Sequence, residues 1–166
     1  VASDSAHMRP NFMMPNEKLK RLILSDPELY IKKMVKKSKV MKNEHYNSAF
    51  AYMMSKRFVQ WYAQRCAFKY LDTKGIRVFS VSPGFVKTPM TEKETGEASN
   101  TMLSYSGLKR GAEPEEIAFL ITSLCDKRCG YFVGADVLCD GGCVNNGYFI
   151  KNARKPYDGA SSKENW

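Results

Sequence analysis

Tyr52 and Lys56, four residues apart, are a pair whose types and spacing suit proton transfer. On a helix, residues at this spacing lie one turn apart on the same face. A lysine ammonium beside a phenol favours the phenolate, so such a pair can exchange a proton with a carbonyl or alcohol oxygen. The spacing recurs twice, at Tyr70/Lys74 and Tyr105/Lys109. Spacing alone therefore does not distinguish the first pair, and the surrounding sequence must.

The segment that carries Tyr52 is predicted to be a long amphipathic helix. Asn47 or Ser48 can cap its start, and Gly75 in a left-handed conformation can end it. Between these ends, apolar side chains recur at a period near 3.6 residues, which predicts one buried side. They are Ala51, Met54, Phe58, Tyr62, Cys66 and Tyr70.

A strand and a ligand-binding turn are predicted next. Residues 76–81 are short and rich in β-branched and aromatic side chains, which is typical of a strand. Pro83 cannot donate to a sheet ladder, so the strand must end there. Gly84 then lets the backbone pass close to a ligand.

From about residue 47 to residue 144, this order of blocks resembles the C-terminal half of the short-chain dehydrogenase/reductase family. The resemblance implies an α/β fold, in which all 166 residues form part of a doubly wound, Rossmann-type NAD(P)-binding domain. In the family, the Tyr-x-x-Ser-Lys block carries the catalytic residues, here Tyr52 and Lys56. The Pro-Gly-x-x-x-Thr block wraps the nicotinamide end of NAD or NADP, and it matches Pro83, Gly84, Phe85, Val86 and Thr88.

The resemblance also implies a role for each residue. Tyr52 would be the general acid/base, and Lys56 would hold the ribose hydroxyls and favour the phenolate. The backbone near Val86 would meet the nicotinamide carboxamide. The Thr88 hydroxyl would face the cofactor amide or the pyrophosphate.

Two parts of the family's site are not found in this sequence. Val1-Ala2-Ser3 resembles the end of the strand that carries the catalytic serine, so that serine would immediately precede Val1, with Ser3 and Ser5 as alternatives. The glycines never form the G-x-G-x-x-G dinucleotide loop. We therefore expect this chain to be the second half of a longer enzyme. The N-terminal half of the same enzyme would be its partner.

Residues 11–43 are predicted to be a helical insertion before the catalytic helix. Asn16 can cap a helix through Leu24, and Ser25 or Asp26 can cap a second one that begins at Pro27. Lysines occupy one face of the second helix, and apolar residues at helical spacing occupy the other: Leu29, Tyr30, Met34 and Val35.

The insertion resembles that of bacterial 3α-hydroxysteroid dehydrogenase/carbonyl reductases, which implies a bulky apolar substrate. Four apolar residues ahead of its helices can either fill the core or contact such a substrate: Met8, Phe12, Met13 and Met14.

The remainder of the chain is predicted to cover the substrate and complete the sheet. Residues 89–112 show no strand pattern, and a loop-like segment after a cofactor site is predicted to be a lid. A helix is expected from Glu113 to Cys125, with Pro114 at its first position. Residues 134–142 resemble the family's last strand and its Asp-Gly-Gly turn. A homodimer through residues 113–139 is expected, because the basic insertion would oppose pairing along the catalytic helix.

The composition argues against several classes of function. No run is long and apolar enough to span a bilayer. The five cysteines lack metal-ligand spacing and are expected to be free thiols in a cytoplasmic protein. The net charge is +9, but the lysines concentrate between Lys32 and Lys42. A solvated basic surface is therefore favoured over a nucleic-acid site.

These observations predict an oxidoreductase that transfers a hydride between NAD(P)(H) and a small apolar secondary alcohol or ketone, with a hydroxysteroid as a candidate substrate. The alternative is a non-catalytic relative or fragment of the same family that acts as a binding module. Retention of Tyr52 and Lys56 favours the enzyme, whereas the lack of the glycine-rich loop favours the module.

Overall fold

The structure, a computed structural model, describes residues 1–8, 14–39, 42–89, 91 and 97–146. Two strands, β1 (Ser80–Pro83) and β2 (Asp136–Cys139), form a parallel sheet. The helices are η1 (Asp4–His7), α1 (Glu17–Arg21), η3 (Leu22–Leu24), α2 (Pro27–Ser38), α3 (Glu44–Lys74), α5 (Glu97–Tyr105), α6 (Pro114–Cys125) and η4 (Lys127–Cys129). None of them, within the described ranges, has the length and apolar character needed to cross a membrane.

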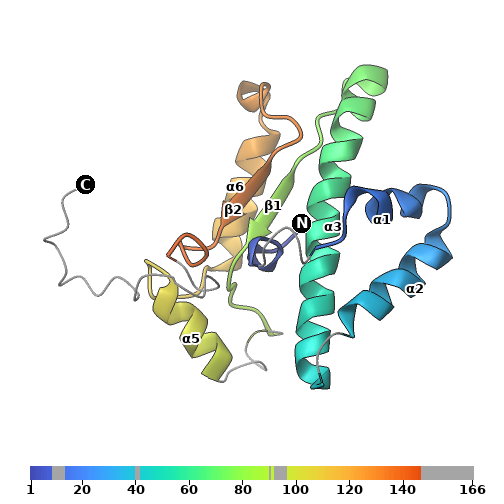
Figure 1. Cartoon of the computed structure of the whole chain (residues 1–166). Helices are drawn as coiled ribbons and strands as arrows, with labels where there is room; N and C mark the ends of the chain where they lie inside the picture. Colours follow the sequence, from blue (N-terminus) through green and yellow to red (C-terminus); the bar gives the residue numbers. More distant parts are fainter. Residues whose placement is uncertain (9–13, 40–41, 90, 92–96, 147–166) are drawn as a thin grey trace, which may run out of the picture.

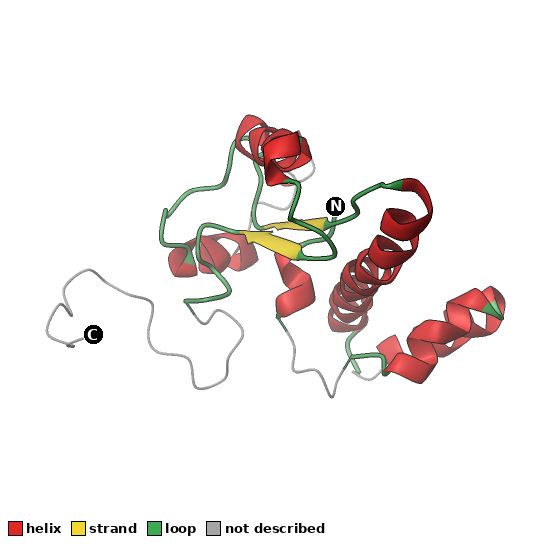
Figure 2. Ribbon diagram, turned by 90° about the horizontal axis from the view of Figure 1, so that it is seen from above, coloured by secondary structure: helices red, strands yellow, loops and turns green. Residues whose placement is uncertain are grey.

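Parallel strands lie between helices in this fold. Ser80 pairs with Asp136, and Pro83 pairs with Cys139. The Ala2 N–H donates to the Val81 carbonyl at 2.7 Å, so the N-terminal residues run beside β1 on the edge away from β2. The helices α3 and α6 lie on different sides of the two strands (Figures 1 and 2). This layering agrees with the α/β class predicted from the sequence.

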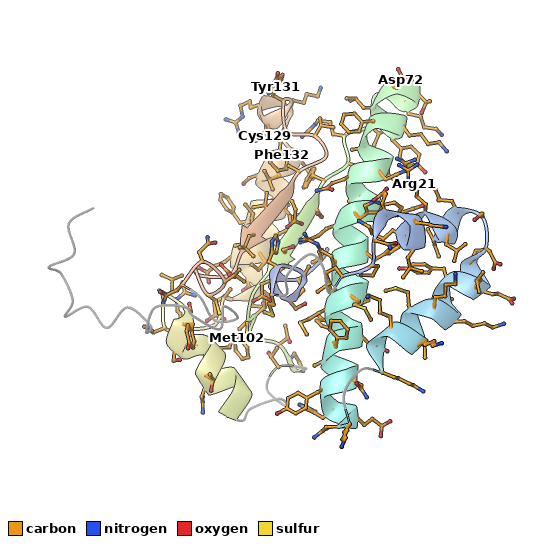
Figure 3. The ribbon with its side chains drawn as sticks, viewed as in Figure 1. Arg21, Asp72, Met102, Cys129, Tyr131 and Phe132 are labelled. Atoms are coloured by element: carbon orange, nitrogen blue, oxygen red, sulfur yellow. The ribbon has the colours of Figure 1, made fainter. Side chains whose placement is uncertain are left out.

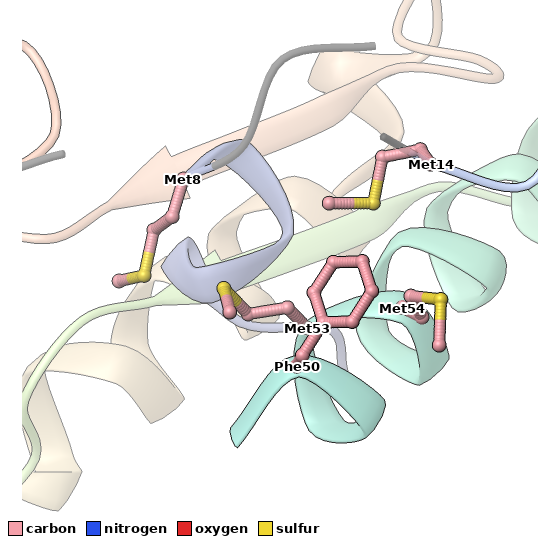
Figure 4. Packing of buried hydrophobic residues seen from close by; sticks show 5 residues of the cluster. All are labelled: Met8, Met14, Phe50, Met53 and Met54. Carbon is pink, nitrogen blue, oxygen red and sulfur yellow. The ribbon is translucent and has the colours of Figure 1, made fainter. Parts of the chain in front are cut away.

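The apolar core joins the N-terminal residues to the first half of α3. Its buried members are Met8, Met14, Phe50, Met53 and Met54 (Figure 4). Met34 of α2 packs against them from outside. Met8 and Met14 are therefore core residues, whereas Phe12 and Met13 lie outside the described residues.

The start of α3 differs from the prediction, and its end agrees. The helix begins at Glu44 rather than after Asn47 or Ser48, because the Asn43 side chain accepts the His45 N–H at 2.9 Å and caps it there. The predicted end is confirmed. Gly75 has a φ of 65°, and its N–H donates to the Leu71 carbonyl at 2.9 Å.

The predicted buried stripe of α3 is only partly correct. Met54 is buried, but Tyr62 and Tyr70 are exposed, and the buried set includes residues that the stripe omitted: Phe50, Met53, Gln60 and Ala67. The reason is that α3 has neighbours in two directions. One side faces η1 and the sheet, and the other meets α2, where the rings of Phe58 and Tyr30 lie 5.1 Å apart.

The first strand is shorter than predicted, since it begins at Ser80 and not at Ile76. The residues before it are bonded to a different part of the chain. The Val78 carbonyl accepts the Gly134 N–H at 2.8 Å. The Arg77 guanidinium donates to the carbonyls of Cys129 and Phe132, at 2.9 and 3.3 Å, in the turn labelled in Figure 3. The predicted end at Pro83 is confirmed.

The two helices expected ahead of α3 are present. The Asn16 side chain accepts the Leu19 N–H at 2.9 Å, and the Asp26 carboxylate accepts the Leu29 N–H at 2.9 Å, so both predicted caps are confirmed. The first helix tightens to a 3-10 turn at Leu22. In α2 the predicted apolar stripe is only half buried: Tyr30 is buried, whereas Leu29 and Val35 are exposed. This face is therefore only partly covered by the described chain.

Candidate active site

Tyr52 and Lys56 lie side by side on α3, as the spacing predicted. The Lys56 ammonium nitrogen stands 5.4 Å from the centroid of the Tyr52 ring. Tyr52 is 51% exposed, so a substrate oxygen could approach its phenol from solvent. The hydroxyl of Ser55, in the same block, donates to the Tyr52 carbonyl at 2.7 Å. The pair thus has the cation and the accessible hydroxyl that proton transfer to a carbonyl needs.

The Pro83–Thr88 loop leaves the end of β1 and runs toward the same end of the molecule as the first half of α3 (Figure 1). Its glycine has a role that the sequence did not indicate. The Gly84 N–H donates to the Cys139 carbonyl at 3.0 Å. A Cβ on Gly84 would lie 2.7 Å from the Asp140 Cα. Glycine is required here because the loop packs against the chain's own backbone.

The middle of the loop is bonded to the segment that leads into α6. Ala112 donates from its N–H to the Phe85 carbonyl at 2.9 Å, and its carbonyl accepts the Lys87 N–H at 2.9 Å. Ion pairs accompany this bridge, since Lys87 contacts Glu113 and Arg110 contacts Glu116. The Arg110 guanidinium lowers the pKa of the Glu116 carboxyl to about 2.

Thr88 and Thr91 form a local cluster at the end of the loop. The Thr91 hydroxyl accepts the Thr88 N–H at 2.8 Å and donates to the Val86 carbonyl at 2.6 Å. The two hydroxyl oxygens lie 3.2 Å apart. Thr91 is not among the residues that the sequence motifs predicted. A threonine three residues after another could have indicated it, because hydroxyls at that spacing often cap the backbone of a turn.

Ser3, one candidate for the catalytic serine, caps η1. Its hydroxyl accepts the Ser5 N–H at 3.3 Å and donates to Asp4 at 3.1 Å. The Asp4 side chain is buried, and burial raises the pKa of this carboxyl to about 6, although the Ser3 hydrogen bond acts in the opposite direction. Ser5 is also buried, and its hydroxyl has no partner in the described residues.

Part of the predicted lid is a helix. Within residues 89–112 the described chain forms α5, where the sequence indicated an irregular segment. The end of α5 is tied to the turn after β2, because Cys143 Sγ donates to the Met102 carbonyl at 3.4 Å and Asn146 Nδ2 donates to the Tyr105 carbonyl at 2.8 Å. Met102, labelled in Figure 3, also lines a cavity of about 80 Å³ behind Phe85, between α5 and α6.

All five cysteines are free thiols, as predicted from their spacing: Cys66, Cys125, Cys129, Cys139 and Cys143. Cys143 is buried beneath α5, and burial, with the nearby acids Asp4 and Asp140, raises the pKa of its thiol to about 12.

Comparison with curated proteins finds similarity over somewhat less than half of the chain. A 3-oxoacyl-[acyl-carrier-protein] reductase of Thermotoga maritima is 43% identical over 76 residues, which are 46% of this chain and 31% of the relative. A 3-alpha-(or 20-beta)-hydroxysteroid dehydrogenase of Mycobacterium bovis is 40% identical over 74 residues, 45% of this chain and 26% of the relative. The matched segments thus span about a third or less of these proteins.

Solved structures that resemble this chain are also matched over only part of their length. A short-chain dehydrogenase/reductase from Serratia marcescens has a TM-score of 0.52 and 32% identity, and the match covers 57% of this chain and 38% of that one. BdcA, solved in complex with NADPH, has a TM-score of 0.50 and 28% identity, covering 55% and 36%. These neighbours confirm that the α/β layers form part of a Rossmann-type fold.

A family model also matches residues 32–144, which are more than half of the chain. Its description is enoyl-(acyl carrier protein) reductase. The matched range contains α3 with Tyr52 and Lys56, the Pro83–Thr88 loop and β2. With this match and the named structural neighbours, the chain belongs to the short-chain dehydrogenase/reductase family.

Proposed function

We propose that the enzyme containing this chain is an NAD(P)-dependent oxidoreductase that interconverts a secondary alcohol and a ketone. The observation that carries this is the Tyr52–Lys56 pair on α3, in a chain that also has a Pro83–Thr88 loop held in place by its own backbone. Tyr52 would donate a proton to the carbonyl oxygen during reduction and remove it from the alcohol during oxidation. Lys56 would stabilise the phenolate and bind the ribose hydroxyls of the cofactor.

The loop has a feature that suits the nicotinamide end of NAD or NADP. Among the described residues, the Val86 N–H has no hydrogen-bond partner, while the carbonyl of the same residue is bonded to Thr91. A carboxamide oxygen could accept from this N–H, with the Thr88 hydroxyl and the backbone of Pro83, Gly84 and Phe85 around it. The bound cofactor would supply the hydride chemistry, and the chain's residues would orient it.

Loss of the Tyr52 hydroxyl should abolish most of the activity. Tyr52→Phe in the complete enzyme keeps the ring and removes the proton, so turnover should fall at least about a hundredfold. Tyr70→Phe is a matched control, because Tyr70 stands on the same helix four residues before Lys74. Near-normal turnover in Tyr52→Phe, or an equal loss in both variants, would exclude the assignment.

The proposed substrate is a small apolar alcohol or ketone, with a hydroxysteroid as the first compound to test. The relatives are named for acyl-carrier-protein, CoA and steroid compounds, so their names alone do not identify one substrate class. Residues 11–43, as an insertion, and residues 89–112, as a lid, would border the substrate. Deleting residues 16–40 should therefore raise the KM for a steroid more than the KM for a short ketone. An equal change in both would reject the hydroxysteroid.

We further propose a cytoplasmic homodimer that pairs through residues 113–139. The apolar ring of Phe119 on α6 is 74% exposed and would lie in that contact. Phe119→Glu should give a monomeric mass by light scattering, whereas Phe68→Glu, on the equally exposed Phe68 of α3, should leave a dimer. The opposite pattern would place the interface on α3.

A further inference from the structure

A cluster of hydrogen-bonded polar side chains lies between α3 and the two strands, where a helix–sheet interface is usually apolar. We define this polar cluster as His7, Gln60, Ser80, Ser82 and Asp136. It joins η1, α3, β1 and β2. These elements carry, or lead directly into, every residue assigned to the proposed site.

The Asp136 carboxylate is the centre of the polar cluster. It accepts hydrogen bonds from Ser80, from Ser82 at 2.8 Å and from Gln60 at 2.9 Å, and it lies 2.9 Å from His7 Nε2. Burial raises the pKa of this carboxyl, but the hydrogen bonds from His7, Ser80 and Ser82 outweigh burial and hold the pKa below its ordinary value. A charged carboxylate with this many donors fixes their directions, because a buried charge that loses its partners is costly.

Gln60 connects α3 to the polar cluster. It is 4% exposed and is the one polar residue among the buried residues of α3; the others are Phe50, Met53, Met54 and Ala67. Its Nε2 donates to Ser82 on β1 and to Asp136 on β2, both at 2.9 Å. His7 Nε2 on η1 lies 2.7 Å from the same nitrogen and is linked to Gln60 through Asp136, to which it donates.

The apolar contacts of α3 fix the position of this helix less precisely than the hydrogen bonds of Gln60 do. Methionine side chains adapt to irregular gaps, so a Met-rich contact tolerates small sliding or rotation of the helix. Hydrogen bonds are directional and lose strength steeply when misaligned. Gln60 follows Lys56 by four residues and Tyr52 by eight on one continuous helix, so any shift of α3 at Gln60 also moves both residues.

We propose that Gln60 is a positioning residue for catalysis, and this inference rests on the proposed function. By binding β1 and β2, it fixes the axial and rotational position of α3 against the sheet. Ser82 immediately precedes Pro83, so the same contact relates Tyr52 and Lys56 to the start of the loop. His7 fixes the position of η1, which follows the predicted serine strand, relative to the helix that carries Tyr52 and Lys56. An error of about 1 Å in such a placement can cost about a hundredfold in rate.

Gln60→Leu in the complete enzyme should lower kcat about ten- to hundredfold while the KM for the cofactor stays within about twofold, because the loop is held by its own contacts. Gln64→Leu, on an exposed glutamine of the same helix, should change neither value. An exchange variant, Gln60→Glu with Asp136→Asn, retains one amide and one carboxylate. It should recover at least about tenfold of the kcat that Gln60→Glu alone loses.

The outcomes separate this inference from the proposed function. A folded Gln60→Leu enzyme with normal kcat, alongside an inactive Tyr52→Phe enzyme, overturns the positioning role and leaves the function intact. Normal turnover in Tyr52→Phe overturns both. If Gln60→Leu does not fold, Ser82→Ala decides, since it leaves Gln60 in place and removes its contact with β1 together with the Ser82 hydrogen bond to Asp136. A lowered kcat at an unchanged cofactor KM then supports the role, and an unchanged kcat overturns it.

Discussion

The Tyr52–Lys56 pair and the Pro83–Thr88 loop would act on the same molecules, yet they are held in place differently. The loop is fixed by short-range contacts on several sides: backbone bonds to Ala112 and Cys139, and the Thr91 hydroxyl. Tyr52 is exposed and touches Lys56 one turn away. Its position therefore depends on where α3 lies as a whole.

The difference teaches that one substitution can disturb the two parts of the site separately. A change in the loop should affect cofactor binding and stability together, because the same contacts serve both. A change on the exposed face of α3 should affect turnover with little change in stability, because exposed side chains contribute little to folding.

The largest effect is expected at Lys56. Lys56→Ala should lower turnover about a hundredfold and raise the cofactor KM, because the lysine serves both the phenolate and the ribose. The melting temperature should stay within about 2 °C of the wild type. Lys74→Ala, at the corresponding position of the second Tyr-x-x-x-Lys pair, is the control and should be normal in all three measurements. A melting temperature that falls with the activity would show that Lys56 is structural.

A smaller but broader effect is expected at Gly84. Its Cβ would meet the Asp140 Cα at 2.7 Å, and backbone cannot move aside as a flexible side chain can. Gly84→Ala should lower the free energy of unfolding by about 2 to 3 kcal/mol and raise the cofactor KM.

Gly75→Ala provides the comparison for that variant. Gly75 has a φ of 65° and open space around it, so alanine there should cost about 1 kcal/mol through backbone strain alone. Its cofactor KM should not change. If both glycine variants shift the KM equally, general destabilisation and not the loop accounts for the effect.

The smallest effect concerns Asp4, which lies in η1 against α3. Burial raises the pKa of this carboxyl from 3.8 to about 6, and the side chain is only 2% exposed. Because the pKa of Asp4 is higher in the folded state than in the unfolded state, Asp4 stabilises the fold fully below about pH 4. This stabilisation is lost as the pH rises through about 6. Asp4→Asn imitates the neutral acid, so it should match the wild type at pH 4 and exceed it by about 2 kcal/mol at pH 7.5.

Denaturant unfolding of both proteins between pH 4 and 7.5 measures this difference. Asp72→Asn is the control, because Asp72 is exposed at the far end of α3 (Figure 3). A wild-type advantage that grows with pH would contradict the assigned burial of Asp4.

The sequence by itself determined the features that depend on neighbouring residues. The caps at Asn16 and Asp26, the left-handed end at Gly75 and the strand end at Pro83 are local matters of hydrogen bonding and backbone geometry. The contact between Tyr52 and Lys56 also follows from helical spacing alone.

Only the tertiary structure decided which distant residues meet between α3, the strands and the loop. His7 and Asp136 meet although 129 residues separate them, and Gln60 reaches both. Gly84 is required by Asp140, which lies far along the chain. Helical periodicity could not identify the buried face of α3, because that helix packs against α2 on one side and against η1 and the sheet on another. Burial is a property of the assembled neighbours, and the order of residues along one helix does not contain it.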